Sequence, residues 1–282
     1  MMKKIIGIGE ILWDMLPQGK QLGGAPANFA YHVSRLGGNG WAVSAISDDE
    51  LGREIISVLG EKDLNVCLSH VDAPTGTVAV TLDAAGVPSY EITENVAWDM
   101  VPFSPEVEML AKDAEAVSFG TLAQRSEVSR STIMKFIDAM PEDSLKVYDI
   151  NLRQHYYSEE IIRKSLEVSD ILKINDEELE TVSDIFALEG DQTERCRRLI
   201  EMFSLRLVIL TKGSKGSDVV TVDKVDSVVP VDVAVVDTVG AGDAFTAAFI
   251  VSYLRGDSIE DAHRLAGEVS SYVCTKAGAM PE

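Results

Sequence analysis

Short apolar runs alternate with amphipathic segments along the middle of the sequence, and this alternation constrains the fold more than any other feature. The predicted elements of this part are strand 114–119, helix 127–140, strand 146–150, helix 158–168, strand 171–174, helix 193–203 and strand 205–211. Such alternation builds a mostly parallel sheet with helices on both faces and right-handed crossovers. The predicted class is α/β, and ligands are expected at the carboxyl ends of the strands.

Further elements are predicted on either side of this part. They are strand 3–9, strand 40–46, helix 50–59, a hairpin from 75–83 and 87–93 around the turn 83–86, a second hairpin from 218–222 and 226–230, an apolar strand over 228–236, a helix over 244–254 and a second long helix that closes the chain. A hairpin inserted among helix–strand units should lie outside the main sheet. The hairpin at 75–93 is therefore expected to stand apart from it.

Composition limits the partners. The 282 residues include 25 basic and 46 acidic side chains, a formal charge of −21. This balance argues against nucleic acid or an anionic membrane as partner, because both attract clustered Lys and Arg. No apolar run approaches the roughly 18 residues that a membrane span needs.

Cysteines and histidines give no sign of a metal site or a disulfide. Cys67, Cys196 and Cys274 are an odd number without a CxxC pair, which predicts reduced core thiols in a cytoplasmic protein. The histidines show no ligand spacing and predict neither a metal site nor a Ser-His-Asp arrangement; they are His32, His70, His155 and His263. They are expected to be structural or surface residues.

The stretch 237–245 (DTVGAGDAF) places Gly240, Ala241 and Gly242 where a loop becomes the first turn of a helix. The first amides of a helix lack partners within it and carry partial positive charge, so small residues there make a cradle for a phosphate. Asp243 would repel an anion beside this cradle, but it makes sense as a base that takes a proton from an attacking hydroxyl. An ordinary helix start is the alternative for Gly-x-Gly-Asp taken alone.

A second motif lies near the beginning of the chain. Gly23 and Gly24 precede a helix that Pro26 suits as its first turn, and Asn28 lies inside this helix, where it neither caps nor packs well. A solvent-facing Asn28 is the alternative. The order Asp14, GGAPAN and DTVGAGDAF resembles the motif order of the ribokinase-like (PfkB) family of carbohydrate kinases, and the likeness extends over nearly the whole chain.

This resemblance implies a ribokinase-like three-layer sandwich, with 1–282 as a single kinase domain and a small β lid from about 11–16 and 75–99. It also implies transfer of a phosphoryl group from Mg-ATP to a primary hydroxyl of a small sugar. Asp243 would be the general base, and the amides of Gly240, Ala241, Gly242 and Asp243 would stabilise charge on the transferring phosphoryl group. The sugar would be oriented by Asp14, Gly23, Gly24 and Asn28.

Other residues take implied roles at the ends of predicted strands. Arg153 would contact substrate or phosphate, and Trp98 would either stack on the sugar or anchor the lid, with the anchor favoured. The resemblance assigns the nucleotide to Thr211, Gly213, Gly216 and Asn175, and magnesium, through water, to Asn175 and Glu178. Potassium binding near 237–243 and a homodimer through the lid are further implications.

Within the family, the closest likeness is to bacterial fructokinase, on the segments 9–14 (GEILWD), 74–78 (PTGTV) and 97–99 (AWD). A 2-keto-3-deoxygluconate kinase is the first alternative, with Arg153 meeting the carboxylate of the acid, and ribokinase is the second. A non-catalytic sugar-binding protein is the alternative from another class. It is disfavoured because the base and the glycine turn are both present.

Overall fold

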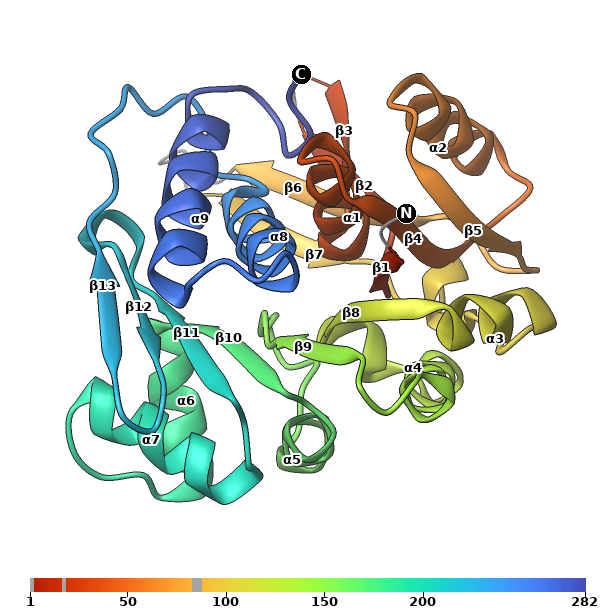
Figure 1. The fold of residues 1–282 in the computed structure, drawn as a ribbon. Helices are drawn as coiled ribbons and strands as arrows, with labels where there is room; N and C mark the ends of the chain where they lie inside the picture. Colours follow the sequence, from red (N-terminus) through yellow and green to blue (C-terminus); the bar gives the residue numbers. More distant parts are fainter. Residues whose placement is uncertain (1–2, 17–18, 83–87) are drawn as a thin grey trace.

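The computed structural model describes residues 3–16, 19–82 and 88–282, and its centre is a twisted nine-stranded sheet (Figure 1). The strands, in order across the sheet, are β13 (Val225–Val228), β12 (Ser217–Val220), β11 (Leu207–Thr211), β10 (Ile171–Asn175), β9 (Leu145–Asp149), β8 (Ala114–Gly120), β1 (Lys4–Ile8), β4 (Asn39–Ile46) and β5 (Asn65–His70). The seven strands from β11 to β5 are parallel, and β12 and β13 form an antiparallel hairpin at one edge. The predicted α/β class is confirmed.

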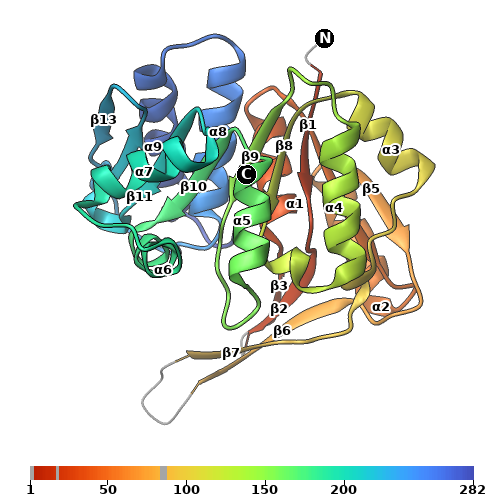
Figure 2. The same cartoon turned by 90° about the horizontal axis from the view of Figure 1, so that it is seen from below.

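Helices cover both faces of this sheet (Figures 1 and 2). One face carries α1 (Ala25–Arg35), α8 (Ala241–Leu254) and α9 (Ile259–Cys274), with α2 (Glu50–Glu61) beyond α1; the other carries α3 (Pro105–Lys112), α4 (Glu127–Ala139), α5 (Glu159–Glu167), α6 (Asp176–Phe186) and α7 (Gln192–Phe203). Residues 244–252 of α8 are all buried, because this helix is enclosed by the sheet, α1 and α9. An all-round apolar helix is the pattern expected of such a central position.

A second, four-stranded sheet lies beside the end of the sandwich (Figure 2). Its order is β3 (Gly19–Gly23), β2 (Leu12–Leu16), β6 (Gly76–Leu82) and β7 (Pro88–Ile92). The predicted lid is therefore present, but β3 was not predicted, and residues 97–100 form a 3₁₀ helix rather than strand. The predicted turn at 83–86 lies outside the described residues. We call these four strands the lid.

The base of the lid is fixed by a buried cluster. Trp98 is completely buried among apolar lid residues, and the Arg125 guanidinium lies 3.9 Å from the centroid of its ring. Arg125 Nε and Nη2 each donate to the Asp99 carboxylate at 2.8 Å. A Cβ at Gly76 would lie 2.5 Å from the Trp98 ring, so β6 reaches Trp98 only because residue 76 is glycine.

The predicted strand over 228–236 is wrong. β13 ends at Val228, and residues 229–240 contain no strand. Val229, Val235 and Val236 are 79%, 62% and 65% exposed, so no sheet covers these β-branched side chains, and Pro230 cannot donate a ladder hydrogen bond. The run of β-branched residues indicated a strand, but Val231, Val233 and Val235 line a cavity instead of joining a sheet. The predictions also omitted β5, α3 and α6.

The segment after α9 returns across α1. Tyr31 Oη donates to the Pro281 carbonyl at 2.5 Å, the His32 ring is hydrogen-bonded to the Ala279 carbonyl at 2.9 Å, and the Gly278 amide donates to Asp237 at 3.0 Å. This segment therefore joins α1 to the loop that leads into α8.

The cysteines are free thiols, with Cys196 buried and the other two half-buried. Within the described residues no helix has the length and apolarity that crossing a bilayer requires.

Candidate active site

The two glycine motifs of the sequence meet where the first turn of α1 faces the first turn of α8. Asn28 Nδ2 donates to Asp243 Oδ2 at 2.7 Å, and Asn28 is only 4% exposed. The solvent-facing alternative for Asn28 is therefore wrong. A Cβ at Gly7 would lie 2.1 Å from the Pro26 carbonyl oxygen, so glycine in β1 is what lets α1 come this close to the sheet.

The turn before α8 has the predicted form of an anion cradle. Gly240 caps the helix with φ +76°, and the Ala244 amide donates back to its carbonyl at 2.9 Å. Within the described residues, the amides of Gly242 and Asp243 have no hydrogen-bond acceptor. A Cβ at Gly240 would lie 2.5 Å from Ala279 Cβ, so the returning segment after α9 also requires glycine here. The Ala241 amide, which was also predicted to bind the transferring group, instead donates to the Thr238 carbonyl at 3.2 Å. The free donors beside Asp243 are therefore those of Gly242 and of Asp243 itself.

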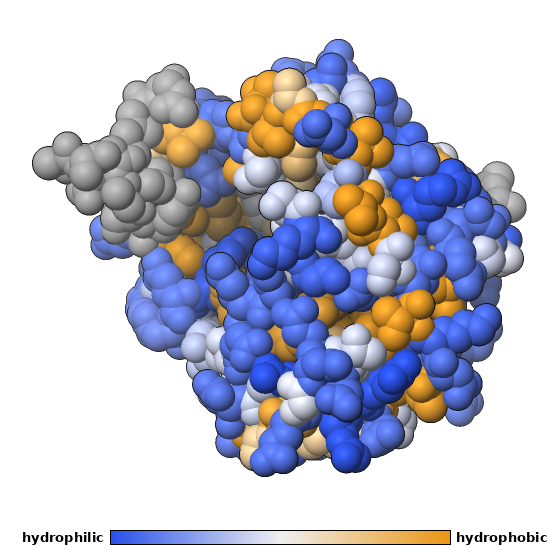
Figure 3. All heavy atoms as spheres, turned by 90° about the vertical axis from the view of Figure 1, so that its left-hand side faces the viewer, coloured by the Kyte–Doolittle hydropathy of each residue, from blue (hydrophilic) through white to orange (hydrophobic). Residues whose placement is uncertain are grey.

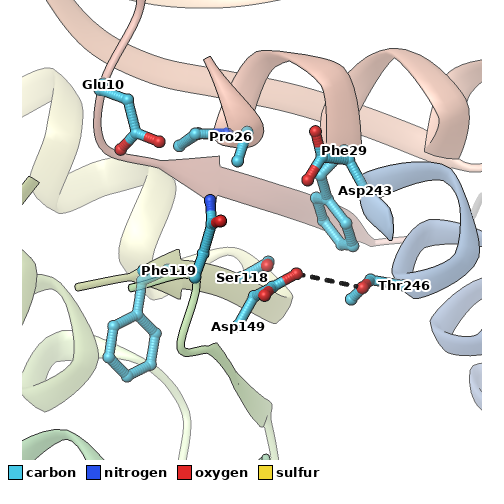
Figure 4. A pocket seen from close by; sticks show the side chains of 11 residues that line it. Glu10, Pro26, Phe29, Ser118, Phe119, Asp149, Asp243 and Thr246 are labelled. Atoms are coloured by element: carbon cyan, nitrogen blue, oxygen red, sulfur yellow. Dashed lines mark hydrogen bonds between the residues drawn. The ribbon is translucent and has the colours of Figure 1, made fainter. Parts of the chain in front are cut away.

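Buried charges surround Asp243. Burial raises the pKa of Asp243 to about 7, and the nearby Asp149 carboxylate adds to this, while the Asn28 hydrogen bond and the Lys173 charge oppose it. Lys173 Nζ donates to Asp149 Oδ1 at 3.0 Å, and Thr246 Oγ1 donates to the other oxygen at 3.3 Å (Figure 4). A Cβ at Gly242 would be 3.1 Å from Lys173 Nζ, which places this ammonium directly under the cradle.

The residues predicted to orient a sugar, which we call the sugar-side residues, lie around the start of α1. Asp14, in β2, is half-buried, and a Cβ at Gly23 would lie 2.5 Å from its Oδ2. Gly24 has φ +116°, and a Cβ there would lie 2.5 Å from the Glu10 carbonyl oxygen. Arg153 is exposed at the rim, where its charge acts on Asp14 and Asp243. Burial raises the pKa of Asp14, and Arg153 opposes that rise.

Trp98 does not join this group. It is completely buried beneath Arg125 at the base of the lid, as the favoured anchor interpretation requires, and it has no exposed face to stack on a sugar.

A cavity of about 680 Å³ lies on the other side of the cradle. The predicted nucleotide residues line it: Thr211, Gly213, Gly216 and Asn175, together with Ala241 and Gly242 of the cradle. Val228, Val231, Val233 and Val235 form one wall of the cavity. Figure 3 shows hydrophobic residues grouped on this side of the molecule. The volume lies within the range of small-molecule and cofactor sites. One cradle therefore separates a large cavity from the sugar-side residues.

Asn175 and Glu178 make a capping box at the start of α6. The Glu178 amide donates to Asn175 Oδ1 at 2.7 Å, the Asn175 amide donates to Glu178 Oε2 at 2.9 Å, and the Leu152 amide donates to Glu178 Oε1 at 2.8 Å. Both carboxylate oxygens are thus engaged, and the described residues contain no cluster of three metal-ligating side chains. This donor set fits magnesium held through water, which Mg²⁺ commonly retains.

Three buried charged residues near Asp243 were not predicted as part of the site: Glu10, Asp149 and Lys173. Lys173 could have been found from the sequence, because a lysine inside the apolar strand β10 is buried and therefore needs a charged partner. A hydrogen-bonded Ser-His-Asp chain was not predicted either. His263 Nε2 is 2.7 Å from Ser217 Oγ, and its Nδ1 is 2.6 Å from Asp226 Oδ2. His263 is fully buried, so this chain ties α9 to the β12–β13 hairpin rather than facing a substrate.

Comparison with known proteins gives the family. Residues 17–282 match the pfkB family of carbohydrate kinases. The chain belongs to this family. A probable fructokinase-2 of Arabidopsis thaliana is 31% identical over 98% of this chain and 92% of its own length, and fructokinase-2 of Oryza sativa is 29% identical over 98% and 90%.

Solved structures of the family share the fold. An uncharacterized sugar kinase of Pyrococcus horikoshii has a TM-score of 0.84 at 28% identity, covering 98% of this chain and 93% of that one, and its complex with ATP is also known. A double mutant of Vibrio cholerae fructokinase with fructose, ADP and a potassium ion has a TM-score of 0.83 at 25% identity, covering 99% and 94%. The α/β sandwich with its lid is thus a pfkB fold.

Proposed function

We propose that this carbohydrate kinase transfers the γ-phosphoryl group of ATP to a primary hydroxyl of a small sugar, and that the sugar is fructose. The observation that carries the proposal is Asp243. It is held by Asn28 beside the free amides of the cradle, between the large cavity and the sugar-side residues. A carboxylate with a pKa near 7 can accept a hydroxyl proton at neutral pH.

The proposed roles follow from this arrangement. Asp14 and Asn28 bind sugar hydroxyls, and the Gly23–Gly24 backbone lets the sugar approach α1. Asp243 removes the proton of the attacking hydroxyl, while the Gly242 and Asp243 amides bind the phosphoryl oxygens. Arg153, at the rim, adds positive charge on the open side, and Lys173 adds it from below.

ATP would occupy the large cavity, with its phosphates toward Gly242. Magnesium, held through water by Asn175 and Glu178, would neutralise charge on those phosphates. Potassium binding near the loop 237–243 is part of the same proposal. The Vibrio cholerae relative binds a potassium ion, and in this chain hydrogen bonds hold the loop 237–243 in place. Asp237 accepts hydrogen bonds from Val239 and Gly278 amides at 3.0 Å each, which holds the loop against the segment after α9.

Fructose is proposed over the alternatives because the named plant and bacterial relatives are fructokinases. The exposed Arg153 keeps 2-keto-3-deoxygluconate as the second candidate, since a guanidinium at the rim can pair with a carboxylate. A homodimer through the lid is part of the proposal, because β3 and β7 are edge strands of the lid sheet. Light scattering that gives a monomer would exclude it.

The test is ATP consumption by the purified protein with Mg²⁺ and a panel of fructose, 2-keto-3-deoxygluconate, ribose, glucose and adenosine. A kcat/KM for fructose well above that of every other member supports the proposal. Preference for another member would keep the kinase and replace its substrate. No turnover with any of them would favour the non-catalytic sugar-binding alternative.

A further inference from the structure

A small pocket lies behind the cradle, and it is lined by three carboxylates (Figure 4). Glu10 follows β1, Asp149 ends β9 and Asp243 begins α8, so three distant parts of the chain bring negative charge to one place. The pocket has a volume of about 10 Å³, which is room for about one water molecule. The proposed mechanism uses Asp243 and leaves Glu10 without a role.

The three carboxylates differ in what they contact. Asp149 is paired with Lys173 at 3.0 Å, and Asp243 accepts the Asn28 amide at 2.7 Å. Glu10 is 4% exposed, and its Oε2 is buried without a hydrogen-bond partner among the described residues. A buried carboxylate without a cation partner becomes neutral rather than remain ionised.

Burial and the charge of Asp243 favour the neutral state of Glu10, while other groups around it oppose that state. Asp243 faces it from α8, and burial together with that negative charge raises the pKa of Glu10 to about 7. Arg153, after β9, opposes the rise, as do the amides of Glu10 itself and of Ala25 at the start of α1. The buried Lys173 ammonium is engaged by Asp149. Two carboxylates thus share one pocket with no cation bound to either, an arrangement that favours a proton on one of them.

We propose that Glu10 is a positioning residue that works as a neutral carboxylic acid, holding a proton so that Asp243 remains the ionised, proton-accepting carboxylate of the pocket. The proposal rests on the proposed function, because it gives Glu10 a role beside the base. Ionisation of Glu10 would place a second free negative charge next to the transferring phosphoryl group. Activity should therefore fall at alkaline pH as Glu10 ionises, and fall at acid pH as Asp243 becomes protonated.

The first test is the pH profile of kcat/KM in Glu10→Gln, which keeps the shape of a neutral carboxylic acid and cannot ionise. We expect the alkaline limb to move up by about one pH unit or more, with the acid limb retained. Glu142→Gln is the control for the loss of one negative charge, because Glu142 is exposed and precedes β9, at the opposite end of that strand from Asp149. An alkaline limb that stays in place in Glu10→Gln overturns the proposal.

The second test needs no substrate. The protein is labelled with ¹³C at the glutamate side-chain carboxyls and titrated by NMR. The Glu10 signal is identified as the one that is missing from the spectrum of Glu10→Gln. We expect it to titrate near pH 7, against about 4.3 for an ordinary glutamate. A midpoint below about 5.5 overturns the proposal. Because this measurement reads Glu10 directly, it separates a failure of this inference from a failure of the proposed function.

Discussion

Replacing Arg125 by methionine should destabilise the protein more than the loss of any surface arginine. Arg125 and Asp99 are each 7% exposed and share two hydrogen bonds of 2.8 Å, and the guanidinium also donates to the Thr93 carbonyl at 2.6 Å. It stacks on Trp98 at 3.9 Å. All of these contacts hold the base of the lid to the sandwich.

The expected loss follows from these contacts. Removing one partner of a buried ion pair costs about 3–5 kcal/mol, because the other charge stays buried and unpaired. The stacking on tryptophan adds about 0.5–2 kcal/mol, part of which the methionine side chain recovers by packing. We expect the free energy of unfolding to fall by about 4 kcal/mol, measured by urea denaturation at fixed pH.

Two controls make this prediction specific. The double variant Arg125→Met with Asp99→Asn removes the unpaired charge and should recover about half of the loss. Arg163→Met removes an arginine that also pairs with a carboxylate, Glu159, and stacks on a ring, but at a partly exposed site, and it should cost far less. A loss below about 1 kcal/mol in Arg125→Met would show that the pair is not what fixes the lid.

Three further predictions concern the site. Asp243→Asn keeps the shape of the base and should lower kcat by about 10² or more, while ATP binding, measured by calorimetry, stays within a few-fold; near wild-type turnover would exclude Asp243 as base. Since the pKa of Asp243 is raised to about 7, kcat/KM should fall about tenfold per pH unit below neutrality, and a flat profile down to pH 5 would contradict this. Gly240→Ala should abolish turnover and lower the melting temperature, because φ is +76° and the new Cβ would lie 2.5 Å from Ala279; retained kcat would mean that the loop can move aside.

The sequence predicted the cradle well because its chemistry is local. Gly240, Ala241, Gly242 and Asp243 are contiguous, and the start of a helix has the same free amides whatever surrounds it. The alternation of strands and helices likewise predicted the parallel sheet, because the hydrophobic period belongs to each segment by itself. These parts of the fold could be inferred without knowing which elements pack against one another.

Features that depend on distant neighbours could not be predicted. The valines of 229–236 suggested a strand, but Val231, Val233 and Val235 line a cavity whose other wall comes from β11 and α9. The sequence around Asn28 does not indicate that its side chain bonds to Asp243, 215 residues away. The chain of Ser217, His263 and Asp226 comes from three elements, and no spacing in the sequence could reveal it.

The 215-residue separation of Asn28 and Asp243 also has a consequence for biosynthesis. β1, β4 and β8 are complete by residue 120 and can pair while the rest of the chain is still being made. Phe29 and Val33 of α1 share a hydrophobic cluster with α8 and α9, and until these helices arrive the side of α1 that packs against α8 stays uncovered. The nascent chain therefore presents an apolar surface to the cell for most of its synthesis, and a ribosome that stalls before α8 releases a product that invites aggregation.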